Sequence, residues 1–252
     1  MIESRLAIIG GTGLYQLPGL QLLDSVDLDT PYGSTSAPIR LGHLAGVPLA
    51  FLARHGEQHQ HAPHRVNYRA NIWALAEIGA PRILAINAVG GIAVDCGPRR
   101  LAIPDQLIDY TWGRESSFAD EAAGEVRHID LSEPYAPCLR RDLQLAANRV
   151  GVAVSDGGIY GVTQGPRLET RAEIQRLRRD GCTLVGMTSM PEAALARERS
   201  IPYACLAVVA NWAAGIGDQG EITMSEIEEN LRAGLGDVAK LLISLATQLD
   251  RP

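Results

Sequence analysis

The stretch "RILAINAVGG", residues 82–91, is a continuous apolar run that ends in glycines. Such a run is typical of a strand that is buried on both faces of a sheet. Other apolar or alternating runs predict further strands at residues 5–10, 22–28, 37–44, 47–53, 106–111, 157–163, 183–187 and 203–211. We therefore expect residues 82–91 to form the central strand of a sheet.

Helical patterns alternate with these strands. The apolar residues between Val66 and Ile78 fall near helical spacing, and Gly79 can end that helix. Further helices are predicted at residues 138–150, 169–180, 191–199 and 223–249, with Gly234 and Gly236 weakening the last one. The alternation favours an α/β fold with a central mixed β-sheet flanked by helices, in a single domain that spans residues 1–252.

The composition is that of a soluble globular protein, with 252 residues, 46% hydrophobic, 21% charged and a formal net charge of −6. This charge predicts no general attraction to nucleic acid or to an anionic membrane. The N-terminus is too short and too charged for a signal peptide, and no apolar run reaches the roughly 18 residues of a membrane span. Four widely spaced cysteines predict reduced thiols. We expect a cytoplasmic protein.

Polar side chains follow five of the apolar runs: Thr12, the pair Arg54 and His55, Asn87, Thr188 and Asn211. Ligands of open α/β sheets bind at the carboxyl ends of the strands, so these residues predict one shared crevice. Lys240 is the only lysine and lies in a helical pattern, which excludes a phosphate-binding loop built on lysine. Any phosphate must be bound by arginine, hydroxyl groups and backbone N–H groups.

The glycine turn "IIGGTGLY" permits two interpretations beside that of a plain tight turn. A dinucleotide-binding turn requires Gly-x-Gly-x-x-Gly, but Gly11 and Gly13 are followed by Gln16. An NAD-dependent oxidoreductase would rest on this turn alone. A turn that exposes Thr12 also suits a bare phosphate, because backbone N–H groups and the hydroxyl can donate together.

Four histidines lie between His55 and His64. Pairs four residues apart could bind a metal, but Pro63 interrupts the run and Glu57 is the only acidic residue in it. We expect no metal site here and interpret the later histidines as solvated loop residues. Arg54 and His55 differ, because a guanidinium and an imidazole at a strand end suit an anion.

Four motifs together resemble the methylthioadenosine phosphorylase branch of the trimeric purine nucleoside phosphorylase family. They are "GGTGLY" (10–15), "ARHGEQHQHAPHRVNYRANIWAL" (53–75), "GPRLETRAEI" (165–174) and "GMTSMPEAALARE" (186–198). The resemblance covers nearly the whole chain. It implies the nucleoside phosphorylase fold, a homotrimer with sites near the subunit interfaces, no metal or organic cofactor, and inorganic phosphate as co-substrate.

The resemblance also implies residue roles. Met187 should lie against the ribose, and His128 should approach the 5′ region from a neighbouring subunit. Asn211, Trp212 and Ala213 should line the base site. The phosphate site should comprise Thr12, Arg54, His55, Asn87, Ala88 and Thr188. The family often has threonine in place of Asn87, so the Ala88 backbone N–H is the firmer expectation.

Two stretches, with three changed positions, depart from the adenine-specific members of this branch. Asn211 and Ala213 replace two aspartates, and Glu169 replaces a serine, as in 6-oxopurine phosphorylases. An ionised glutamate only accepts hydrogen bonds, so Glu169 suits the N1–H of a 6-oxopurine and repels the N1 lone pair of adenine. Asn211 can both donate to and accept from the departing base. We therefore assign Glu169 and Asn211 as the catalytic pair.

The expected reaction is phosphorolysis of methylthioinosine to hypoxanthine and 5-methylthioribose 1-phosphate, by a pentosyltransferase of purine salvage. A general inosine and guanosine phosphorylase and a methylthioadenosine phosphorylase are the alternatives within the family. From other classes, an NAD-dependent oxidoreductase and a non-catalytic nucleoside-binding protein are the alternatives.

Overall fold

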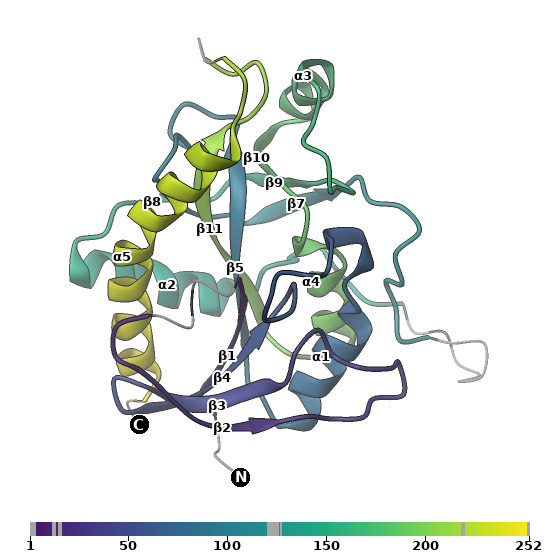
Figure 1. Ribbon diagram of the computed structural model, residues 1–252, viewed down its shortest axis with the longest axis vertical. Coiled ribbons are helices and arrows are strands. Elements are labelled where there is room, and N and C mark those ends of the chain that lie inside the picture. Colours follow the sequence, from purple (N-terminus) through teal and green to yellow (C-terminus); the bar gives the residue numbers. More distant parts are fainter. Residues whose placement is uncertain are drawn as a thin grey trace.

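The computed structural model describes residues 4–11, 14, 17–119, 126, 128–217 and 220–250. Its strands form an 11-stranded mixed sheet (Figure 1). They are β1 (Leu6–Gly10), β2 (Leu20–Val26), β3 (Ile39–Leu44), β4 (Val47–Ala53), β5 (Ile83–Gly91), β6 (Leu101–Ile103), β7 (Gln106–Asp109), β8 (Val154–Asp156), β9 (Ile159–Val162), β10 (Cys182–Gly186) and β11 (Tyr203–Trp212). The order is β2-β3-β4-β1-β5-β10-β9-β7, and β11 pairs with β5 and β6. The predicted central strand is thus the strand around which the sheet branches.

Helices cover both faces of the sheet. They are η2 (Pro63–Arg65), α1 (Tyr68–Glu77), α2 (Pro137–Val150), α3 (Arg171–Arg179), α4 (Ser189–Glu198) and α5 (Met224–Leu249). In Figure 1, α2 and α5 lie on one side of β1 and β5, and α1 and α4 lie on the other. Alternate residues of a strand point to opposite faces, so Leu6 and Ile8 join the α2/α5 core while Ala7 and Ile9 join the α1/α4 core. The α/β architecture with a flanked mixed sheet is confirmed.

The predicted elements differ from the structure mainly at short strands. The sequence pattern missed β6 and β8, which have three residues each and are too short to show a period. Helix α5 runs without interruption through Gly234 and Gly236. A Cβ on Gly234 would lie 2.9 Å from a methyl group of Val208 in β11, so the missing side chain lets the helix approach the sheet closely.

The sheet is open beside the middle of β5. Along one edge of β5, β11 pairs in parallel with the whole strand. Along the other edge, β1 pairs with Ile83–Ala85 and β10 pairs, antiparallel, with Gly90 and Gly91. The carboxyl ends of β1 and β10 therefore meet from opposite directions next to Asn87 and Ala88. Ala88 is exposed although it lies inside the central strand, so this gap forms a natural binding crevice.

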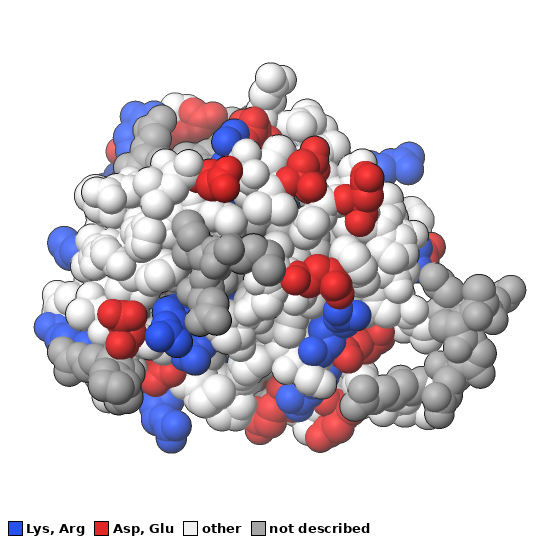
Figure 2. All heavy atoms as spheres, turned by 90° about the horizontal axis from the view of Figure 1, so that it is seen from below, with Lys and Arg blue, Asp and Glu red and all other residues white. Residues whose placement is uncertain are grey.

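Charged side chains of both signs are interspersed on the face of the molecule shown in Figure 2. No helix in the described part of the chain is long and apolar enough to cross a membrane.

Candidate active site

Arg54 lies directly after β4 and its side chain is almost fully buried, at 2% exposure. Its backbone N–H donates to the carbonyl of Gly10 at the end of β1, which joins the two parallel strand ends. The guanidinium forms a two-pronged ion pair with Glu192 of α4, with Nε to Oε1 at 2.6 Å and Nη2 to Oε2 at 3.0 Å. Its Nη1 donates to the carbonyl of Ile86, the residue before Asn87. The guanidinium thus lies beneath the gap in the sheet.

His55 is half-buried beside Arg54. Burial, together with the charge of Arg54, lowers the pKa of His55 from 6.5 to about 4. Its Nδ1 is 2.8 Å from the carbonyl of His61, so the neutral ring donates from Nδ1 and leaves Nε2 as an acceptor. The rings of His55 and His59 lie 4.6 Å apart, which shows that the histidine run folds back on itself.

Asn87 and Thr188 face the gap from β5 and from the N-terminal end of α4. Asn87 is 1% exposed and neither polar atom of its side chain has a hydrogen-bond partner among the described residues. The same holds for the hydroxyl of Tyr160 in β9. Burial raises the pKa of Tyr160, while the charge of Arg54 and the nearby polar side chains of Asn87 and Thr188 oppose the rise. Buried polar groups normally have partners, so this cluster is suited to a polar ligand.

The predicted phosphate-binding residues are therefore brought together by the fold, as far as they are described. The carboxyl ends of β4 and β10, together with the middle of β5, bring Arg54, Asn87, Ala88 and Thr188 to one region. Thr12 lies outside the described residues. Its neighbour Gly11 follows β1 at the same edge of the sheet.

Glu169 lies in the loop between β9 and α3. The hydroxyl of Thr163 donates to Glu169, with Oγ1 to Oε1 at 2.5 Å, and the Thr163 N–H donates to the carbonyl of Gly186 at 2.8 Å. Burial raises the pKa of Glu169, while the hydrogen bond from Thr163 opposes the rise. One carboxylate oxygen is therefore fixed by the protein, at the end of the strand that leads into Met187.

Asn211 lies at a β-bulge near the end of β11, where the register with β5 shifts and Asn211 pairs with Gly90. Bulges redirect side chains, and here the Asn211 amide donates to the carbonyl of Trp212 at 2.7 Å. Ala213 follows the end of β11, and its backbone N–H donates to the carbonyl of Gly91. Two strands, β5 and β10, separate β11 from β9, a span of about 14 Å at strand spacing. The hydrogen bonds that the two side chains make to described residues go to different partners, Trp212 for Asn211 and Thr163 for Glu169.

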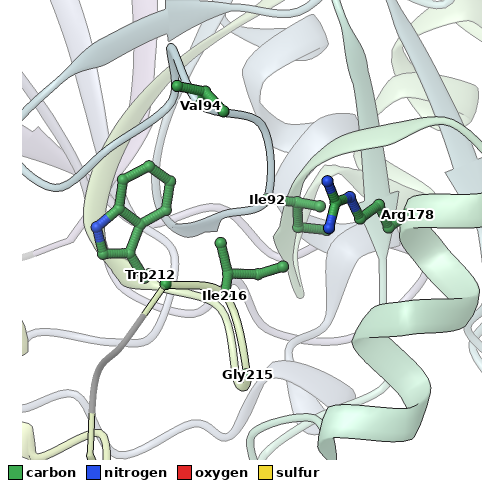
Figure 3. A pocket seen from close by; sticks show the side chains of 7 residues that line it. Ile92, Val94, Arg178, Trp212, Gly215 and Ile216 are labelled. Carbon is green, nitrogen blue, oxygen red and sulfur yellow. The ribbon is translucent and has the colours of Figure 1, made fainter.

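Trp212 alternates with Asn211 along the strand and lines a pocket of about 330 Å³ (Figure 3). Ile92, Val94, Ile216 and Arg178 line the same pocket, which includes neither Asn211 nor Glu169. Glu169 lines another pocket, of about 270 Å³, together with Tyr110, Trp112, Thr163, Arg167 and others. Trp212 and Glu169 therefore line two different pockets.

Met187 is half-buried where β10 leads into α4. A Cβ on Gly165 would lie 2.5 Å from the Met187 sulfur, so the loop before Glu169 passes directly against this side chain. Arg114 links this loop to the segment that contains Met187, because its guanidinium donates to the carbonyls of Met187 at 2.8 Å and Gln164 at 2.8 Å. His128 is exposed and is not part of this cluster within the chain.

Three structurally important side chains escaped the sequence analysis. Glu192 belongs to a quoted motif, but its pairing with Arg54 spans 138 positions and has no local signal. Tyr203 donates to Glu192, and Arg114 lies in a polar loop without periodicity. Among the described residues, no group of three or more histidine, cysteine, aspartate or glutamate side chains could hold a metal ion.

Comparison with known proteins shows the family of the chain. Residues 5–247 match the family model described as the phosphorylase superfamily. A probable S-methyl-5′-thioinosine phosphorylase of Xanthomonas campestris pv. campestris is 60% identical over 96% of this chain and 96% of its own. A probable 6-oxopurine nucleoside phosphorylase of Thermococcus kodakarensis is 44% identical over 97% and 92%.

A solved structure of a methylthioadenosine phosphorylase from an antarctic soil metagenomic library superposes with a TM-score of 0.93. It is 36% identical and covers 100% of this chain and 89% of its own. On the family match and on these identities, the chain belongs to the phosphorylase superfamily.

Proposed function

We propose that this protein is a pentosyltransferase that cleaves S-methyl-5′-thioinosine with phosphate, giving hypoxanthine and 5-methylthioribose 1-phosphate in purine salvage. The observation that carries the base assignment is Glu169. Thr163 occupies one of its carboxylate oxygens, which leaves the other to accept the N1–H of a 6-oxopurine. Relatives with 56–60% identity that bear the name S-methyl-5′-thioinosine phosphorylase support the 5′-methylthio group.

In the proposed reaction, a phosphate oxygen bonds to the anomeric carbon while the bond from that carbon to the purine nitrogen breaks. The bonding electron pair leaves with the base, so positive charge develops on the sugar and negative charge on the purine. Arg54, His55, Thr12, Thr188 and the Ala88 N–H hold phosphate beneath the ring, with Asn87 beside them. In other enzymes a preorganised donor of this kind contributes about 3–4 kcal/mol.

Asn211 and Glu169 act on the base. Asn211 donates to O6 or N7 as negative charge develops, and accepts from N7 once it carries a proton. Glu169 holds N1–H. Adenine offers a lone pair at N1 and would face the carboxylate without a shared proton. A mismatch of this kind at a buried polar site discriminates by about 10⁴–10⁵ where the site is fully closed.

The same proposal includes the assembly and the setting. We infer a homotrimer of single-domain subunits in the cytoplasm, with inorganic phosphate as the co-substrate and neither a metal nor an organic cofactor. His128 is exposed on its own subunit, which agrees with a role at a neighbouring site. Met187 lies against the ribose.

A general 6-oxopurine nucleoside phosphorylase is the second candidate, because relatives of that name reach 44% identity. Parallel assays of base release from methylthioinosine, inosine and methylthioadenosine, each with and without phosphate, separate the possibilities. We expect phosphate-dependent release that is fastest from methylthioinosine. Faster release from inosine would favour the second candidate, and faster release from methylthioadenosine would overturn the assigned roles of Glu169 and Asn211.

A further inference from the structure

We propose that Glu192 and Tyr203 are positioning residues that orient Arg54 for phosphate. The inference rests on the proposed function, because it assumes that the anion beneath the gap is the phosphate co-substrate. Neither residue reaches the gap in the sheet, and each acts through the guanidinium.

The side chains of Arg54, Glu192 and Tyr203 are buried and are connected by hydrogen bonds. Glu192 is fully buried and its two oxygens accept from Nε and Nη2 of Arg54. The hydroxyl of Tyr203 donates to Oε2 of Glu192 at 2.9 Å, and its ring is 2% exposed. Burial alone would lower the pKa of Arg54, but the charge of Glu192 and its hydrogen bonds raise it above its ordinary value. The guanidinium therefore stays charged in one fixed orientation.

The donor count shows what this arrangement leaves for a ligand. A guanidinium has five N–H donors in a rigid planar fork. Glu192 accepts from two of them and the Ile86 carbonyl from a third. No acceptor among the described residues takes the other two donors, which lie in the plane that these three contacts fix. Since Glu192 neutralises the charge of Arg54 and His55 is uncharged above about pH 4, orientation contributes more to phosphate binding than net charge does.

This arrangement predicts a selective kinetic effect. Loosening the ion pair of Arg54 and Glu192 should weaken phosphate binding but leave nucleoside binding nearly unchanged. The hydrogen bonds that Glu192 makes to described residues go to Arg54 and Tyr203, and not to Glu169, Asn211 or Met187. A purely structural role would instead reduce stability and affect both substrates alike.

The test is Tyr203→Phe, with Tyr135→Phe as the matched control. The two rings stack on each other with centroids 6.1 Å apart, and both are buried. Tyr135 bonds to the hydroxyl of Ser189 at 2.6 Å, so its variant loses a buried hydroxyl without removing a contact of the ion pair. KM for phosphate, KM for methylthioinosine and Tm are measured for each protein. Glu192→Gln perturbs the ion pair with Arg54 more strongly than Tyr203→Phe does. If Glu192→Gln does not fold, the comparison of Tyr203→Phe with Tyr135→Phe still decides the question.

We expect Tyr203→Phe to raise the phosphate KM by roughly 5- to 20-fold, below the roughly 10- to 150-fold that one hydrogen bond to a charged group can contribute, because Tyr203 acts on phosphate only through Glu192 and Arg54. The nucleoside KM should change less than about twofold. Tyr135→Phe should change both by less than about threefold. Equal changes in the phosphate KM for the two variants would overturn the inference. Absence of phosphate-dependent cleavage by the wild-type enzyme would instead overturn the proposed function, so the two failures are distinguishable.

Discussion

The substitution Glu169→Gln should invert the base preference. In the wild-type structure Thr163 donates to Oε1 of Glu169 at 2.5 Å, and Oε2 is left for the purine. A glutamine that keeps the bond from Thr163 with its carbonyl oxygen must present its NH₂ group to the base. That group opposes the N1–H of hypoxanthine but donates to the N1 lone pair of adenine.

The expected magnitude follows from the contacts. The keto substrate loses one hydrogen bond to a charged acceptor, about 1.5–3 kcal/mol, and meets an opposed donor that costs a similar amount. This predicts a loss of about 10²- to 10⁴-fold in kcat/KM for methylthioinosine. Methylthioadenosine gains one neutral hydrogen bond, about 0.5–1.5 kcal/mol, or about 2- to 10-fold.

The assay is base release from the two nucleosides at saturating phosphate, with kcat/KM as the readout. Glu173→Gln is the matched control, since it removes the same charge four residues away, where Glu173 pairs with Arg167 and caps α3. Glu173→Gln should leave the ratio of kcat/KM for methylthioinosine to kcat/KM for methylthioadenosine within about threefold of the wild-type ratio. If Glu169→Gln changes this ratio no more than Glu173→Gln does, Glu169 does not contact N1 of the purine.

Three further predictions concern the site's ionisation and the packing behind it. Thr163→Val removes the hydrogen bond that opposes the raised pKa of Glu169, so the acid limb of kcat/KM for methylthioinosine should move to higher pH; an unmoved limb would show that Glu169 need not be ionised. Because the folded-state pKa of His55 is lowered from 6.5 to about 4, the unfolded chain binds more protons between those values, and stability falls as pH falls from about 7 to about 4. In urea unfolding, the free energy of unfolding of His55→Gln should fall by up to about 3 kcal/mol less than that of the wild type between pH 7 and pH 4. If the two proteins show the same dependence of stability on pH, the pKa of His55 is not lowered in the folded state. Gly234→Ala should destabilise the protein by about 1–3 kcal/mol because its Cβ would clash with β11, whereas Gly236→Ala, with open space around it, should stabilise it by up to about 1 kcal/mol; equal Tm shifts would argue against close packing of α5.

The fold could be predicted largely because its central strands are long and apolar. Residues 82–91 became β5 (Ile83–Gly91), and the helical spacing between Val66 and Ile78 became α1. The pattern could not predict the pairing of β1 and β10 with different parts of β5, because strand order depends on contacts between distant segments. The gap at Ala88 is a consequence of that pairing.

The site was predictable where a polar side chain follows an apolar run. Arg54, Asn87 and Thr188 were found in this way and lie around one gap. The partners that orient them were not predictable. Glu192 and Thr163 carry no signal of their own, because the partner of each depends on which loops the fold brings together. Assignments that rest on the resemblance, such as the role of His128, stay predictions.

The most direct measurement is a crystal structure of the enzyme with hypoxanthine and phosphate bound. We predict Glu169 Oε2 within hydrogen-bonding distance of N1, the Asn211 amide at O6 or N7, and phosphate on the two remaining donors of Arg54. A base bound with neither Glu169 nor Asn211 in contact with its ring would contradict the proposed roles of both residues.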